Sequence, residues 1–207
     1  MINIPVKSLR HSLVLFTLII GGCASVGKNF SYHQYQSLEI GKTSSEDYRA
    51  IFGNPLIVTT EDTDDEKVEV ANYVYASANL GSARSRALIL EFKDGLLNSY
   101  MYASSFEEEK PILDIAALEK IERGVTSRED AVRTLGEPYG KAKCPSKAPS
   151  FKDRCESVED VYAWSLVEKL STFGVAFGGS RPQSQSVFLG FNSSGKVESV
   201  QKVAVGN

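Results

Sequence analysis

Two stretches of the chain share a motif: GKTSSEDYRAIFGNP at residues 41–55 and GVTSREDAVRTLGEP at residues 124–138. Seven residues recur at an offset of 83: Gly41/Gly124, Thr43/Thr126, Ser44/Ser127, Glu46/Glu129, Asp47/Asp130, Gly53/Gly136 and Pro55/Pro138. A motif that occurs twice is either a duplicated site or a duplicated piece of fold. The roles of the repeated residues decide between these interpretations.

Each stretch combines a helix start with a helix stop. Thr43 with Glu46, and Thr126 with Glu129, fit the capping box, in which a hydroxyl and a glutamate satisfy free amides of the first turn. Apolar residues at helical spacing follow, and then a glycine and a proline that end a helix. Paired acids could also form an acid–base site, but at a helix start they interact favourably with the helix dipole, which explains their presence without catalysis. The repeat therefore predicts two short helices, at 44–52 and 127–135.

Segments with strand composition follow each predicted helix. They are rich in β-branched and aromatic residues, and they lie at 56–60, 67–78, 86–92 and 96–103, and then at 161–167, 186–191 and 196–205. Turns at 93–95 and 192–195 join neighbouring strands. A further short helix is expected within 31–39, and another begins at Asp114.

This order predicts an α+β fold made of two tandem two-layer units. Each unit is expected to have two short helices packed on an antiparallel three- or four-stranded meander sheet. The first unit is placed at 37–103, a linker at 104–113, and the second unit at 114–207.

The N-terminus has the pattern of an export signal. Lys7 and Arg10 precede an apolar stretch, 13–20, that is too short to span a membrane, and IGGC at 20–23 has the form of a lipobox. We expect a signal peptide at 1–22, a lipidated Cys23, and a tether at 23–36. An ordinary signal peptide with a chance cysteine is the alternative.

Lipidation and charge indicate where such a chain would work. Alanine rather than aspartate after Cys23 favours the outer membrane, with the protein facing the periplasm and surface exposure left open. Without residues 1–22, the chain has 21 basic and 26 acidic residues, a net charge of −5. No basic patch suggests nucleic acid as a partner.

The remaining cysteines, Cys144 and Cys155, are expected to form a disulfide, because an exported chain enters an oxidising compartment. Closing so short a loop would contribute about 3 kcal/mol. A zinc site is the alternative, but zinc normally needs four ligands and no histidine lies nearby in the sequence. We therefore expect no metal and no cofactor.

The helix starts, the L-G-x-P stop at 135–138, the aromatic strands and the lipobox together resemble the SmpA/OmlA (BamE-like) family of outer-membrane lipoproteins. The tandem arrangement is similar to folds typified by the β-lactamase inhibitor protein. The resemblance implies two helices on an antiparallel sheet and action by protein contact. The outer-membrane members assist β-barrel assembly, but they carry one unit rather than two.

Catalytic and ligand sites have little support in the sequence. His33 lies near the lipidated end, and the cysteines are assigned to the anchor and the disulfide, so neither a serine nor a cysteine triad is expected. The acidic run at 61–66 lacks the pattern of a calcium loop. The glycine-rich stretch at 172–182 is not followed by the residues of a phosphate-binding loop.

Aromatic residues are the candidates for contact with a partner. Phe173 and Phe177 would be exposed anchors in the glycine-rich stretch, or they would fold back as core. Alternation places Tyr73 with Tyr75, and Tyr162 with Trp164, on one face of their strands. That face either packs on the helices or forms a recognition surface.

We therefore expect a non-enzymatic, lipid-anchored envelope protein that acts as an interaction or scaffold module, with roles in outer-membrane assembly or maintenance open to it. The alternative is an inhibitor or binding partner of a periplasmic or extracellular hydrolase. A membrane contact through Cys23 and an envelope protein partner are expected, without a small-molecule substrate.

Overall fold

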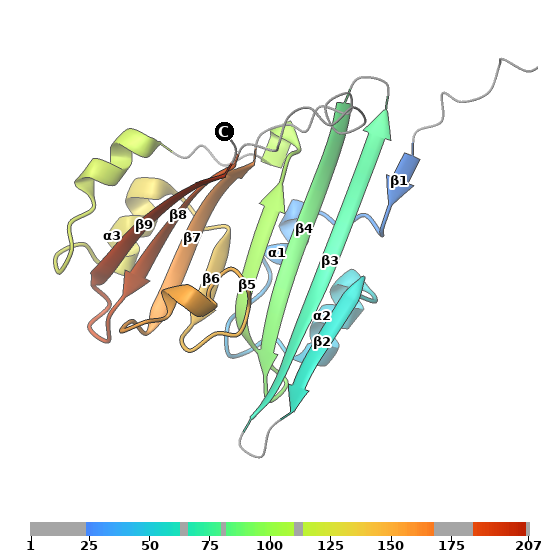
Figure 1. The fold of residues 1–207 in the computed structure, drawn as a ribbon, viewed down its shortest axis with the longest axis horizontal. Coiled ribbons are helices and arrows are strands. Elements are labelled where there is room, and N and C mark those ends of the chain that lie inside the picture. The colour runs from blue at the N-terminus through green and yellow to red at the C-terminus, as the bar shows by residue number, and fades with distance from the viewer. Residues whose placement is uncertain (1–23, 63–65, 80–81, 110–113, 168–183, 206–207) are drawn as a thin grey trace, which may run out of the picture.

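The computed structural model describes residues 24–62, 66–79, 82–109, 114–167 and 184–205, and they form one antiparallel sheet of nine strands. The strand order is β1-β3-β4-β5-β6-β7-β8-β9, and β2 pairs with β3 on the same edge as β1 (Figure 1). The elements are β1 Ala24–Val26, α1 Tyr32–Tyr35, α2 Ser45–Phe52, β2 Ile57–Asp62, β3 Lys67–Asn79, β4 Ser82–Lys93, β5 Leu96–Ser104, η1 Glu107–Glu109, η2 Ile115–Lys120, α3 Arg128–Leu135, β6 Gly140–Lys143, η3 Lys152–Arg154, β7 Asp160–Val167, β8 Ser184–Phe191 and β9 Val197–Val205.

The prediction of two tandem α+β units is wrong, because the strands of both halves belong to a single sheet. The connection is the pairing of β5 with β6, in which Ser99, Tyr100 and Met101 lie opposite Ala142, Lys141 and Gly140. The helices are short, so strands dominate the molecule. The sheet therefore runs without interruption from the N-terminal to the C-terminal half.

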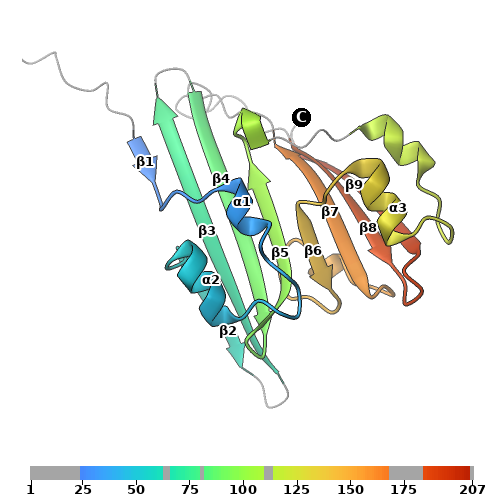
Figure 2. The same ribbon diagram turned by 180° about the vertical axis from the view of Figure 1, so that it is seen from behind.

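Helices α1, α2 and α3 lie on one face of this sheet (Figure 2). Helices α2 and α3 begin and end where the repeated sequences predict, but Ser44 and Ser127 are the N-caps instead of the threonines. Their hydroxyls accept hydrogen bonds from the amides of Asp47 and Asp130, both at 3.1 Å. Gly53 and Gly136, with φ angles of 78° and 80°, end the helices.

The repeated threonines stabilise the turn before each helix. The Thr43 hydroxyl accepts a hydrogen bond from the Glu39 amide at 2.9 Å, and the Thr126 hydroxyl accepts one from the Glu122 amide at 2.8 Å. The expected turn at 93–95 is also present, since Asp94 and Gly95 have positive φ angles, as primed hairpin turns require.

The hydrophobic core lies between the helices and the sheet. Side chains alternate along β4, so that Leu88, Leu90 and Phe92 are fully buried under the helices. A second buried cluster lies under α3 and η2, around Trp164 and Leu189. The first of these two clusters comes from the N-terminal half and the second from the C-terminal half, except that Tyr139 packs in the first cluster.

Two segments expected to be a tether and a linker pack against the sheet. In the first, Phe30 and Tyr35 are buried members of the core. In the second, Phe106 and Glu109 are also buried. The Glu109 carboxylate forms an ion pair with Arg86 at 2.6 Å and accepts hydrogen bonds from the hydroxyls of Tyr102 and Ser104. These contacts fix residues 104–109 onto β4 and β5.

Candidate interaction surface

The sheet surface opposite the helices is the most extensive candidate site. We call it the open face and define it by the alternate residues of β2–β5 that point away from the helices: Ile57, Thr59, Val70, Asn72, Val74, Ala87, Ile89, Met101 and Ala103. In Figure 1 this face is turned toward the viewer, with α1, α2 and α3 behind the sheet. No helix of the described residues lies over it.

Strand register places three apolar side chains of the open face and one asparagine in a single row. Ile57 lies opposite Asn72, Asn72 opposite Ile89, and Ile89 opposite Met101, so one row crosses four strands. Ile57 is 57% exposed, and the other three are half-buried. Val74 lies two residues further along β3 and is also half-buried. The open face thus presents an apolar centre to solvent.

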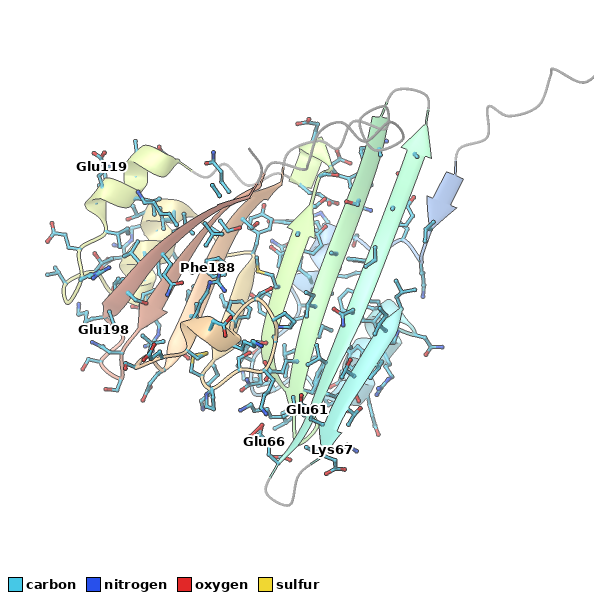
Figure 3. All side chains as sticks on the ribbon, viewed as in Figure 1. Glu61, Glu66, Lys67, Glu119, Phe188 and Glu198 are labelled. Carbon is cyan, nitrogen blue, oxygen red and sulfur yellow. A yellow bond between two sulfur atoms is a disulfide. The ribbon has the colours of Figure 1, made fainter. Side chains whose placement is uncertain are left out.

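A polar rim and a shallow hollow border this apolar centre. The hollow has a volume of about 170 Å³ and is lined by Thr59, Glu61, Val68, Val70, Asn72, Lys147 and Pro149. The Lys147 ammonium lies 3.1 Å from the Glu61 carboxylate, and this hydrogen bond raises the pKa of Lys147. Figure 3 shows Glu61 at the end of the face where β2 and β3 meet.

The loop that carries Lys147 is held by covalent and polar contacts. Cys144 and Cys155 form a disulfide across it, with a Cα–Cα distance of 5.3 Å. Beneath it lies Glu91, whose side chain is fully buried. Its carboxylate accepts hydrogen bonds from the hydroxyls of Ser99 and Ser146 and from the amides of Lys147 and Ala148. The rim of the hollow is therefore rigidly attached to β4 and β5.

Aromatic packing fixes the other end of the same loop. Phe151 is fully buried and contacts Phe188 edge to face, with ring centroids 6.2 Å apart. The Arg154 guanidinium lies over the Phe188 ring at 4.0 Å. Figure 3 shows Phe188 on the sheet surface turned toward the viewer. The loop therefore covers β6–β8 and the Glu91 end of β4 and β5, and leaves Ile57, Asn72, Val74 and Ile89 uncovered by it.

The candidate aromatic residues of the strands lie on the helix side. Tyr73 and Trp164 are 4% and 1% exposed. Their side chains donate hydrogen bonds to the carbonyl oxygens of Gly53 and Gly136, at 2.6 and 2.9 Å. They therefore tie each helix end to the sheet instead of forming a surface. Burial raises the pKa of Tyr73 to about 12.

The remaining candidate contact residues lie either on the helix side of the sheet or outside the described residues. Tyr75 and Tyr162 are half-buried and pack against the two core clusters. Phe173, Phe177 and Cys23 lie outside the described residues, as do the signal peptide and the whole glycine-rich stretch at 172–182. Their expected roles stay predictions.

The described residues offer other chemistry little support. They contain no group of three or more histidine, cysteine, aspartate or glutamate side chains placed to hold a metal ion. None of the helices among these residues is long and apolar enough to span a membrane. His33 is exposed and lies 3.4 Å from the Gln36 side-chain oxygen.

The residues that form the open face were not among the sequence candidates. Ile89 and Glu91 alternate with Leu88, Leu90 and Phe92, so the pattern of β4 contained the signal. A strand with one face assigned to the core leaves its other residues on the opposite face. Reading those alternate residues as a second surface would have identified Ile89, whereas Glu91 on the same side is buried under the disulfide loop.

Comparisons with known proteins give a distant structural similarity. No protein-family model matches the chain, and no curated protein matches it. The chain is similar to a crystal structure of a "putative beta-lactamase inhibitor protein" from Streptococcus mutans, with 12% identity and a TM-score of 0.46. The match covers 84% of this chain and 98% of the other. The SmpA/OmlA resemblance has no support from these comparisons, and the structural similarity is too low to carry an argument about function.

Proposed function

We propose that the protein is a non-enzymatic interaction module of the cell envelope and that its open face binds a partner protein. The observation that carries the proposal is the row of Ile57, Ile89 and Met101, which exposes apolar surface on a sheet face that no described helix covers. An apolar centre with a polar rim is the usual arrangement of a protein interface. A rigid sheet and a loop held at Glu91 would present this surface with little ordering on binding.

Maintenance or assembly of the outer membrane is the role that we propose for such a module, with the lipid on Cys23 as its anchor. The scaffold function needs only a stable surface held near the membrane. The inhibitor function would need the same surface to block a hydrolase. Both predict protein contact at the open face, so the identity of the partner distinguishes them.

Site-specific cross-linking tests the proposed surface. A photo-reactive residue in place of Val74 or Ile89 is expected to cross-link to one partner in intact cells. The control position is Arg133, whose side chain is 76% exposed on the helix side. Val74→Lys combined with Ile89→Lys should reduce the yield from a reporter at Ala87 at least about tenfold, because a buried charge opposes association. Circular dichroism checks that the variant is folded.

Two results would contradict this proposal. One is equal cross-linking from Arg133, and the other is a yield that does not change in the double lysine variant. If the captured partner is a hydrolase and the purified protein blocks its activity, the inhibitor function replaces the scaffold function.

The anchor has its own test. Cys23→Ala is expected to move the protein from the membrane to the soluble periplasmic fraction and to abolish labelling by radioactive palmitate, since no thiol would remain to carry the lipid. Ala24→Asp is the matched control, which should keep the label and shift the protein to the inner membrane. A Cys23→Ala protein that still sediments with membranes would show that another contact holds it.

A further inference from the structure

The contact that joins the two halves of the sheet is a short strand pairing. Residues Ser99–Met101 of β5 lie opposite Gly140–Ala142 of β6. Next to this pairing, the Tyr102 amide donates a hydrogen bond to the Tyr139 carbonyl oxygen at 2.8 Å. The Tyr139 ring then packs on Tyr35 and Tyr102, with centroids 6.2 Å from each.

Strand β2 occupies in the first half the position that β6 occupies in the second. Each strand follows the glycine that ends a helix, Gly53 or Gly136. The amides of Leu56 and Tyr139 donate equivalent hydrogen bonds, each 2.8 Å, to the carbonyl oxygens of Asn72 in β3 and Ala163 in β7. Leu56 therefore corresponds to Tyr139, and Ile57 corresponds to Gly140.

Strand β9 corresponds in the same way to β5. The amides of Leu97 and Val197 donate equivalent hydrogen bonds of 2.9 Å to the carbonyl oxygens of the repeated threonines, Thr43 and Thr126. Counting along the strands from this contact, Gln201 corresponds to Met101 and Lys202 to Tyr102. Strands β5 and β6, which pair inside the sheet, thus have counterparts at its opposite ends: β9 corresponds to β5 and β2 corresponds to β6.

These counterparts have no strand on their outer edges among the residues that the structure describes. All six residues of β2 are exposed. Leu56 and Val58 are 58% and 44% exposed. Exposed strand edges with apolar side chains readily add another strand.

A hollow beside β9 lies where a counterpart of the Tyr139 ring would pack. It has a volume of about 130 Å³ and is lined by Leu118, Gln185, Ser186, Val187, Lys202, Val203 and Ala204. Leu118 corresponds to Tyr35 at the offset of the repeat, and Lys202 corresponds to Tyr102. Both residues that hold the Tyr139 ring therefore have counterparts in the wall of this hollow. The counterpart of Tyr139 itself is the exposed Leu56.

We propose that the protein associates with a second copy of itself, head to tail, by pairing β9 of one molecule with β2 of the next. The contact repeats the β5–β6 pairing, with Leu56 of one copy seated in the hollow beside Lys202 of the other. It sets Gln201 opposite Ile57, Val200 opposite Val58 and Ser199 opposite Thr59.

Such a contact uses two different surfaces. A dimer therefore keeps one free edge at each end, β2 of one copy and β9 of the other. Contacts of this kind produce rings or open chains. The proposal does not depend on the function assigned to the open face, because it uses the edges of the sheet.

Association of the full-length protein in detergent tests the proposal. Sedimentation velocity is expected to show dimers and larger species that increase with concentration. Leu56→Lys should raise the dissociation constant at least about tenfold, since a second ammonium would be buried in the hollow beside Lys202. Leu96→Lys is the matched control, because Leu96 is 46% exposed at a different place and should leave association unchanged.

Cysteine pairs test the register. A mixture of Gln201→Cys and Ile57→Cys proteins is expected to form an intermolecular disulfide, because directly opposite residues of an antiparallel pair bring their Cβ atoms within about 5 Å. Gln201→Cys mixed with Val58→Cys is the control, since a shift of one residue puts the side chains on opposite faces. A protein that stays monomeric at all concentrations, or equal yields from the two mixtures, would overturn the proposal.

Discussion

Glu109→Ala is expected to lower the free energy of unfolding by about 3–5 kcal/mol, because it leaves the buried Arg86 guanidinium without its counter-charge. The side chains of Arg86 and Glu109 are only 9% and 7% exposed. Besides this ion pair, the carboxylate accepts hydrogen bonds from Tyr102 and Ser104, so the substitution also leaves two buried hydroxyls without an acceptor. Urea unfolding of the purified protein measures the change.

An exposed ion pair provides the control for this experiment. Glu39 and Lys42 lie 2.6 Å apart, but their side chains are 61% and 76% exposed. Glu39→Ala should therefore change the unfolding free energy by less than about 1 kcal/mol. Similar losses in the two variants would show that the burial of Glu109 does not matter.

The Glu109 carboxylate also makes the stability of the protein depend on pH. Burial alone would raise the pKa of Glu109, but hydrogen bonds from Arg86, Ser104 and Tyr102 outweigh burial and hold this pKa below its usual value of 4.5. A lowered pKa in the folded protein means that the ionised carboxylate contributes stability above about pH 4.5, and that this contribution is lost as the pH falls further. The stability advantage of the wild type over Glu109→Gln should therefore decrease below that pH.

Glu91→Ala is expected to be destabilising by about 3 kcal/mol or more and to loosen the disulfide loop. The fully buried carboxylate accepts hydrogen bonds from two serine hydroxyls and from the amides of Lys147 and Ala148, and unpaired buried donors cost about 1–3 kcal/mol each. Hydrogen exchange should become at least about tenfold faster at the amides of Lys147 and Ala148. Unfolding measurements give the change in stability.

Glu91→Gln separates charge from hydrogen bonding, since the side-chain carbonyl oxygen still accepts hydrogen bonds while the side-chain NH2 group can only donate them. It should lose less stability than Glu91→Ala. Glu119→Ala, at an exposed position of η2, should leave exchange in the loop unchanged. If exchange at Lys147 is the same in Glu91→Ala and wild type, the loop is held by the disulfide and its aromatic contacts alone.

Local sequence predicts the helices and the long strands of this fold well. The helix caps at Ser44 and Ser127 and the stops at Gly53 and Gly136 depend on residues within one helix length. Strands such as β4 carry a clear alternation of apolar residues. These elements were therefore predicted within a few residues of their bounds.

Strand β6 was not predicted, and this omission explains the error in the fold. Its sequence, GKAK, has neither β-branched residues nor an apolar alternation. Its extended conformation comes from its neighbours, because β5 and β7 pair with it on both sides. Gly140 fits between the side chains of Met101 and Phe151, since a Cβ atom would lie 2.5 Å from the Met101 sulfur and 3.0 Å from the Phe151 ring. Only tertiary contacts show that the two halves share a sheet.

The candidate site was even less accessible to prediction from sequence. Polar residues are normally expected at the surface, so the burial of Glu91 and Glu109 could not be predicted from their types. The partners of Glu91 in the loop lie far away in sequence, with Ser146 separated from it by 55 positions. The aromatic residues of the strands were correctly placed on one face, and burial in the structure identifies that face as the helix side.

Tyr139 also constrains the order of events during synthesis. Its ring belongs to the first core cluster, although its position in the chain follows α3. The N-terminal half emerging from the ribosome therefore lacks one aromatic ring of its core until residue 139 has been made. This half is expected to complete its packing only after α3 has been synthesised.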